Sequence, residues 1–107
     1  MNLSQVQKLA LALPEVTEEP HFHRTSFRVR GKIFATAVAN EPWLNVMVGE
    51  SVREPALHMY PDCVEKLFWG KKVMGLTVNL EKATQSIVAE LLRQAWRAKA
   101  PKSLQSN

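Results

Sequence analysis

The stretch that decides the fold runs from His21 to Phe34 and reads HFHRTSFRVRGKIF. From Phe27 onward, apolar and polar side chains alternate on both sides of the Arg30-Gly31 pair, a pattern typical of two antiparallel strands joined by a tight turn. The stretch contains no acid, and its four cations are Arg24, Arg28, Arg30 and Lys32. The sequence therefore predicts a β-hairpin whose polar face is almost purely positive.

The chain before this hairpin predicts one amphipathic helix. Ser4 and Gln7 stand at capping-box spacing, at which each side chain satisfies a backbone donor at the helix start. Apolar residues then recur at helical spacing from Val6 to Leu13. Pro14 ends the helix, because the residue before a proline avoids the helical conformation.

The chain after the first turn predicts four more strand segments. Residues 33–38 return from the hairpin, and residues 44–48 form a third strand with alternating apolar side chains. In a second hairpin, residues 64–69 and 73–80 flank a Gly70-Lys71-Lys72 turn. Because the segments leave no room for long crossovers, we expect the sheet to be antiparallel.

Two more helices are predicted. The first lies between residues 51 and 60, and its start stays open: Ser51 forms a capping box with Glu54, or Pro55 opens the helix as its first residue. The second runs from about residue 82 to residue 99 and carries one apolar face.

The size and composition of the chain fit one small globular domain. The 107 residues, of which 46% are hydrophobic, allow one core. We expect the domain to cover residues 1–102 and residues 103–107 to form a flexible tail. The predicted fold class is α+β, a two-layer α/β sandwich in the order α-β-β-β-α-β-β-α, with an antiparallel sheet covered by helices on one face.

The same features bear on where the protein works. No apolar run approaches the roughly 18 residues that cross a bilayer, and residues 1–5 lack the order of a signal peptide. Cys63 is the single cysteine, which fits a reducing compartment. We therefore expect a soluble, cytoplasmic protein without a membrane partner, present as a monomer or a weak dimer.

Several stretches of the chain resemble the YjbR/MmcQ family: residues 11–16, residues 21–34, and residues 68–72 together with 95–102. The most specific part is Phe-Arg-Val-Arg-Gly-Lys at 27–32. The resemblance covers nearly the whole chain. It implies a CyaY-like sheet, similar to that of secretion chaperones, and DNA binding through a "double wing" of two hairpins, and it supplies no catalytic residue.

Apart from the resemblance, the residues of the two predicted hairpins also indicate contacts with phosphates, because both hairpins carry cations. Period-two alternation places Arg28 and Arg30 on one strand face, and neutralising phosphates yields affinity through counterion release. Trp69 precedes the second basic turn and could stack on a base, although such residues more often close a core. The residues predicted to bind nucleic acid are Arg24, Arg28, Arg30, Lys32, Lys71, Lys72 and Trp69.

Other features of the chain indicate alternative functions. The competing hypothesis is a protein-interaction module that uses the open sheet face or its edge. His21 and His23 point the same way in an extended segment and could share a metal, but they lack a third ligand at motif spacing. Cys63 with His58 lacks an orienting third group. We therefore expect non-catalytic DNA binding, with no metal and no cofactor.

Overall fold

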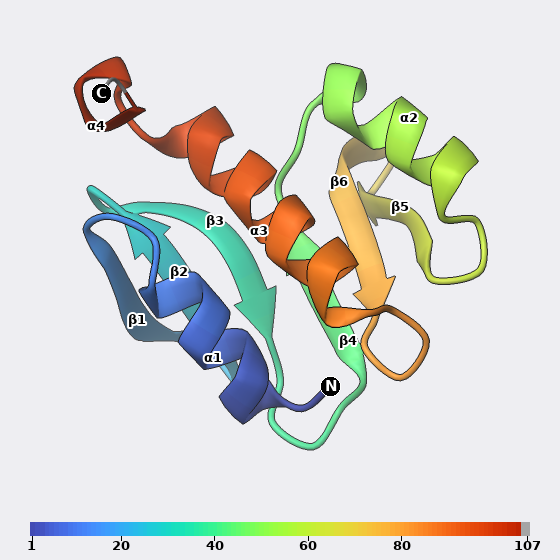
Figure 1. The fold of residues 1–107 in the computed structure, drawn as a ribbon, viewed down its shortest axis with the longest axis horizontal. Coiled ribbons are helices and arrows are strands. Elements are labelled where there is room, and N and C mark those ends of the chain that lie inside the picture. The colour runs from blue at the N-terminus through green and yellow to red at the C-terminus, as the bar shows by residue number, and fades with distance from the viewer. Residues whose placement is uncertain (106–107) are drawn as a thin grey trace.

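The computed structural model describes residues 1–105 and shows a six-stranded sheet with helices on one of its faces (Figure 1). The strand order is β1-β2-β3-β4-β6-β5, and every neighbouring pair is antiparallel. In chain order, the elements are α1 (Leu3–Leu11), β1 (Val16–His21), β2 (Arg24–Val29), β3 (Lys32–Ala37), β4 (Trp43–Val46), α2 (Glu50–Met59), β5 (Val64–Trp69), β6 (Lys72–Asn79), α3 (Gln85–Lys99) and α4 (Lys102–Gln105). The predicted α+β fold class is confirmed.

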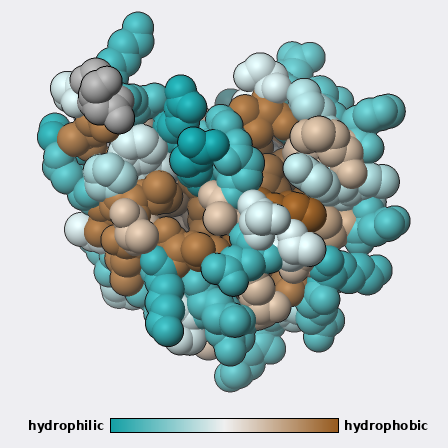
Figure 2. Space-filling model, viewed as in Figure 1, coloured by the Kyte–Doolittle hydropathy of each residue, from teal (hydrophilic) through white to brown (hydrophobic). Residues whose placement is uncertain are grey.

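The core lies between the helices and one face of the sheet. Its central row runs across four neighbouring strands from Phe27 through Ala35 and Val46 to Leu76, and all four side chains are fully buried. The apolar face of α3 covers this row, and α1 packs against α3. Seen from the helix side, apolar side chains gather between α1 and α3, and hydrophilic ones cover most of the remaining surface (Figure 2).

The next row of residues points to the opposite face, because successive side chains of a strand alternate between the two faces. This open face carries no helix in Figure 1. Its row crosses the whole sheet and is polar at every position: Glu19, Ser26, Thr36, Asn45, Thr77 and Glu65.

The structure adds one strand to the predicted order. β1 pairs with β2 from Val16↔Val29 to His21↔Arg24 and forms one edge of the sheet. Its residues Glu18, Glu19 and Pro20 are types that strands usually disfavour, so the sequence pattern predicted no strand here. An edge strand tolerates proline because one side of its backbone needs no partner.

The first helix begins two residues earlier than expected. Asn2, and not Ser4, is the N-cap: its Oδ1 accepts a hydrogen bond from the Gln5 backbone N–H at 3.0 Å. The Gln5 Oε1 in turn accepts from the Asn2 backbone N–H at 2.9 Å. The predicted box of Ser4 with Gln7 is therefore wrong, because asparagine caps as well as serine does and Gln5 reaches back to it.

Both starts considered for the second helix are wrong. Gly49 is the N-cap of α2 and makes no side-chain cap bond, while its carbonyl accepts from the Arg53 N–H at 2.8 Å. The Ser51–Glu54 capping box is not formed, and Pro55 lies inside the helix. Pro55 is exposed, so the backbone bond that it cannot donate is lost where water is at hand.

The last long helix begins at Gln85 rather than near Lys82. Thr84 is its N-cap and accepts from the Ile87 N–H, whereas Lys82 lies in the preceding turn. Of the predicted tail, residues 103–105 belong to α4, whose Gln105 donates to the Arg97 and Ala100 carbonyls, and residues 106–107 lie outside the described residues. None of the helices in residues 1–105 is long and apolar enough to cross a membrane.

β4 is shorter than the strands on either side of it, with four residues against six in β3 and eight in β6. β6 crosses it so closely that a Cβ at Gly75 would lie 2.0 Å from the Val46 carbonyl oxygen, so only glycine fits there. The β4–β6 ladder ends at Val46↔Leu76, whereas the Met47 N–H still donates to the Phe34 carbonyl of β3 at 2.9 Å.

Candidate functional site

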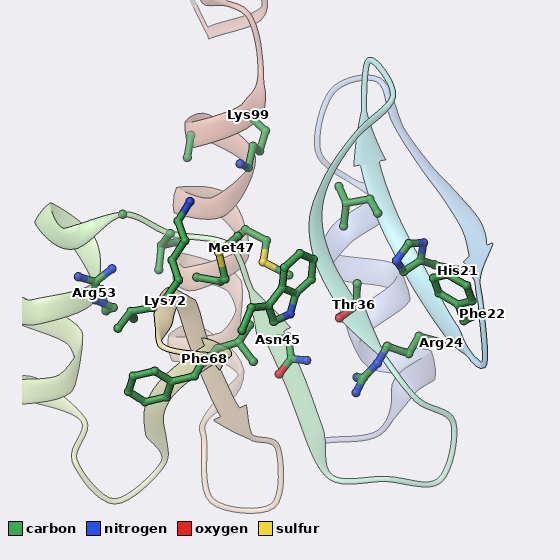
Figure 3. Close-up of a pocket in the computed structure, with 18 of the residues that line it drawn as sticks. His21, Phe22, Arg24, Thr36, Asn45, Met47, Arg53, Phe68, Lys72 and Lys99 are labelled. Atoms are coloured by element: carbon green, nitrogen blue, oxygen red, sulfur yellow. The ribbon is translucent and has the colours of Figure 1, made fainter.

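A groove of about 990 Å³ lies at the end of β4, where it includes residues of the open face and reaches the start of α2 and the end of α3 (Figure 3). Thr36 of β3 and Asn45 of β4 belong to the polar row and lie between its two walls. One wall is the β1–β2 turn, residues 21–24, and the other is formed by residues 67–69 of β5 and the start of β6. The first turn lies to the right and β5 with β6 to the left in Figure 3.

The groove is positively charged. Within the described part of the chain, its lining includes no aspartate or glutamate, and its cations are Arg24, Arg53, Lys72 and Lys99. Arg53 is paired with its neighbour Glu54, with 3.0 Å between Nε and Oε2. The side chains of the other three form no hydrogen bond or ion pair among residues 1–105. Like charges in a concave site reinforce one another, so this groove attracts anions.

Exposed aromatic rings stand on both walls of the groove. Phe68 and Trp69 of β5 are 53% and 63% exposed, and Phe22 in the β1–β2 turn is 91% exposed. Large apolar side chains this exposed mark a binding surface when they cluster around a concave site. The groove therefore offers flat apolar surface beside its cations.

Phe22 sits in a backbone conformation that is costly for its residue type. It is the first of the two residues that connect His21 with Arg24, and its φ is +58°. The first residue of the equivalent β5–β6 turn is Gly70, with φ +60°. A bulky residue at positive φ is an outlier, because its Cβ crowds the backbone, whereas glycine adopts this region freely.

Between the walls, the groove presents polar groups that are only partly used. The Thr77 hydroxyl donates to Asn45 Oδ1 at 2.8 Å, which fixes the orientation of the Asn45 amide. Within residues 1–105 the amide N–H₂ of Asn45 and the hydroxyl of Thr36 have no hydrogen-bond partner, and both residues line the groove. These groups can bond a polar ligand that enters.

The seven residues predicted from sequence divide into those inside the groove and those outside it. Arg24, Lys72 and Trp69 line the groove. Lys32 and Lys71 are exposed at the β2–β3 and β5–β6 turns and do not line it.

The other two arginines are engaged by the chain itself. Arg28 donates from Nε to Ser26 Oγ at 3.0 Å and lies 4.0 Å from Glu19 Oε2. Arg30 binds Glu15 with both fork atoms, Nε to Oε1 at 2.7 Å and Nη2 to Oε2 at 3.0 Å. This hydrogen-bonded pair lowers the pKa of Glu15 and raises the pKa of Arg30, so both stay charged.

The metal and thiol hypotheses gain no support from the structure. His21 and His23 both line the groove, and the His21 ring packs edge-on against Phe22 with centroids 4.9 Å apart. Residues 1–105 hold no group of three or more His, Cys, Asp or Glu side chains placed to bind a metal. Cys63 is buried, and burial raises the pKa of its thiol, the opposite of what activates a nucleophile.

The sequence did not predict six of the groove residues that offer charge, polar groups or rings to a ligand: Arg53, Lys99, Phe22, Phe68, Thr36 and Asn45. Arg53 and Lys99 come from helices far apart in the chain, and no local pattern could bring them together. Phe68 was visible as the neighbour of Trp69 before a basic turn. Phe22 stands out only once β1 is known, because it then occupies a hairpin turn that would favour glycine.

The fold and site define a small two-layer α+β protein with a cationic groove on the open face of its sheet. The YjbR family model matches residues 11–98, and the chain belongs to this family. The crystal structure of Deinococcus radiodurans protein DR2400, with the domain DUF419, is similar, with a TM-score of 0.75 and 19% sequence identity. The alignment covers 89% of this chain and 75% of that one, and at this identity it shows the fold alone. No curated protein matches the sequence.

Proposed function

We propose that this protein binds nucleic acid without catalysing a reaction, and that the groove on its open sheet face is the interface. The observation that carries the proposal is the set of three cations, Arg24, Lys72 and Lys99, that line a groove in which residues 1–105 place no acid and no partner for them. Nucleic acid offers closely spaced phosphates, and each phosphate that a cation neutralises releases condensed counterions. Arg24 can also bind a phosphate with its two-pronged guanidinium.

The proposal moves the interface away from the tips of the hairpins. A wing at the β2–β3 hairpin would rely on Arg28 and Arg30, whose charges already face Glu19 and Glu15. A phosphate that binds these arginines would have to displace or share their interactions with the glutamates. The loss of those interactions would lower the net affinity for nucleic acid. Arg24, Lys72 and Lys99 carry no such cost, because their side chains have no partner within residues 1–105.

A salt titration of two matched double variants tests the proposal. Arg24→Ala/Lys72→Ala removes one arginine and one lysine from the groove, and Arg30→Ala/Lys32→Ala removes the same pair of types from the β2–β3 hairpin. Binding of a labelled oligonucleotide is followed by fluorescence anisotropy between about 50 and 200 mM salt. The two variants have equal net charge, so long-range attraction is matched.

The groove variant is expected to bind roughly tenfold or more weakly at low salt, and its slope of log K against log salt should be shallower by about 1.4 for two lost contacts with a single strand. The hairpin variant should stay close to wild type. Equal losses in both variants would contradict the groove as the interface. Wild-type protein that binds no oligonucleotide, or binding without salt dependence, would contradict the function and favour a protein partner.

A further inference from the structure

We infer that the groove takes single-stranded nucleic acid in preference to duplex, with unpaired bases packed against Phe22 on one wall and Trp69 on the other. This inference rests on the proposed function and specifies the form of nucleic acid. The two rings lie on opposite sides of the groove, one in the β1–β2 turn and the other at the end of β5.

Flat aromatic rings and cations line the same groove. Within a duplex the faces of each base are covered by its neighbours, and only base edges and phosphates are accessible. In a single strand the faces are free, and proteins bind them by stacking on aromatic side chains next to a cationic track. Trp69 lines the same groove as Lys72, three positions on, and Phe22 lines it with Arg24, two positions on.

The backbone conformation of Phe22 also favours a ligand contact for its ring. Its ring is 91% exposed and so contributes little to the core, yet the residue holds a φ of +58° that glycine would adopt without strain. The β5–β6 turn uses glycine, Gly70, in the same situation. Strained backbone conformations of this kind cluster at functional sites. Because the Phe22 ring lies at the groove, we infer that it contacts the ligand.

The size and polarity of the groove fit a short stretch of single strand. Its volume of about 990 Å³ lies at the top of the range of roughly 300–1,000 Å³ typical of small-ligand sites. Such a recess holds a few nucleotides of one strand. The free amide of Asn45 and the hydroxyl of Thr36 lie between the walls, where the edges of inserted bases can bond them.

The test compares one strand of about twelve mixed-sequence nucleotides, alone and annealed to its complement. The single strand is expected to bind wild type at least about tenfold more tightly than the duplex. Phe22→Gly and Trp69→Ala should each weaken single-strand binding about fivefold or more and leave the weaker duplex binding unchanged. Trp43→Ala is the matched control, because Trp43 is 41% exposed but lies outside the groove.

The Phe22→Gly variant separates a loss of binding from a loss of folding. Glycine relieves the positive φ, so the melting temperature should be unchanged or higher while the affinity falls. Equal affinity for strand and duplex, or unchanged strand binding in both aromatic variants, overturns the inference but leaves the proposed function standing if the groove-cation variant still loses affinity. Adenosine monophosphate that displaces the strand at similar concentration also overturns it, because the site would then serve free nucleotides. Failure of wild type to bind either form overturns both proposals.

Discussion

The chain's own acids face the arginines at positions 28 and 30 of the β2–β3 hairpin, whereas three of the four groove cations have no such partner within residues 1–105. The hairpin has the densest positive charge in the sequence, and its Arg30 is held by both oxygens of Glu15. The groove gathers Arg24, Lys72 and Lys99 from β2, β6 and α3, and none of their side chains has a partner within residues 1–105. Charge density along a sequence is therefore a poor measure of the charge that a ligand meets.

The hairpin pair also has a structural role. Glu15 precedes β1 and Arg30 follows β2, and both residues have positive φ, +57° and +51°. The two hydrogen bonds between the side chains hold together two residues whose positive φ usually favours glycine. The arginine of the hairpin is thus explained by the fold, whereas the groove cations are not.

The largest difference between the two regions should appear on charge reversal. Lys72→Glu places an anion inside the groove and should weaken oligonucleotide binding at least about tenfold, because repulsion replaces attraction in a recessed site. Lys32→Glu makes the same change of net charge at the exposed β2–β3 turn and should cost less than about threefold. Anisotropy titrations at one low salt concentration measure both, and a reversed order would break the comparison.

A smaller effect is expected when the hairpin arginine is released. Glu15→Gln removes the partner of Arg30 and frees its guanidinium, so affinity for nucleic acid should rise by roughly twofold, in the range of an exposed charge. Glu41→Gln is the control, since Glu41 is exposed in the β3–β4 connection and the variant has the same net charge. An equal rise in both variants would mean that net charge, and not the release of Arg30, is responsible.

The smallest expected effect is on stability as a function of pH. The pKa of Glu15 is lowered below its usual 4.5, chiefly by its hydrogen bond with Arg30. The pair therefore stabilises the folded protein above pH 4.5 and loses this contribution as the pH falls through the lower folded-state value. Urea midpoints of wild type should exceed those of Glu15→Gln slightly at neutral pH and converge with them in acid. A difference between the two urea midpoints that persists in acid would show that the charge of the Glu15 carboxylate does not cause the difference in stability.

Much of the fold follows from local patterns. Both predicted hairpins form because alternation and turn residues specify them within a few positions, and the same holds for the apolar faces of α1 and α3. The missed strand β1 shows the limit of this reasoning. Its Glu18, Glu19 and Pro20 oppose strand formation locally, and only pairing with β2 at a free edge makes them acceptable.

The candidate site was less predictable than the fold. Arg24, Trp69 and Lys72 were identified because they flank turns in basic stretches. Arg53 lies in α2 and Lys99 in α3, and only the tertiary structure brings both residues to the groove. The sequence also did not predict which arginines pair with acids, because Glu15 and Arg30 are fifteen positions apart.

An NMR titration of the isotope-labelled protein with a single strand of about twelve nucleotides locates the interface directly. If the groove binds the strand, the largest shifts fall on the indole N–H of Trp69, the side-chain amide of Asn45 and the backbone amide of Phe22. Shifts concentrated instead between Arg28 and Lys32, with the groove signals unmoved, would contradict binding in the groove and return the interface to the β2–β3 hairpin.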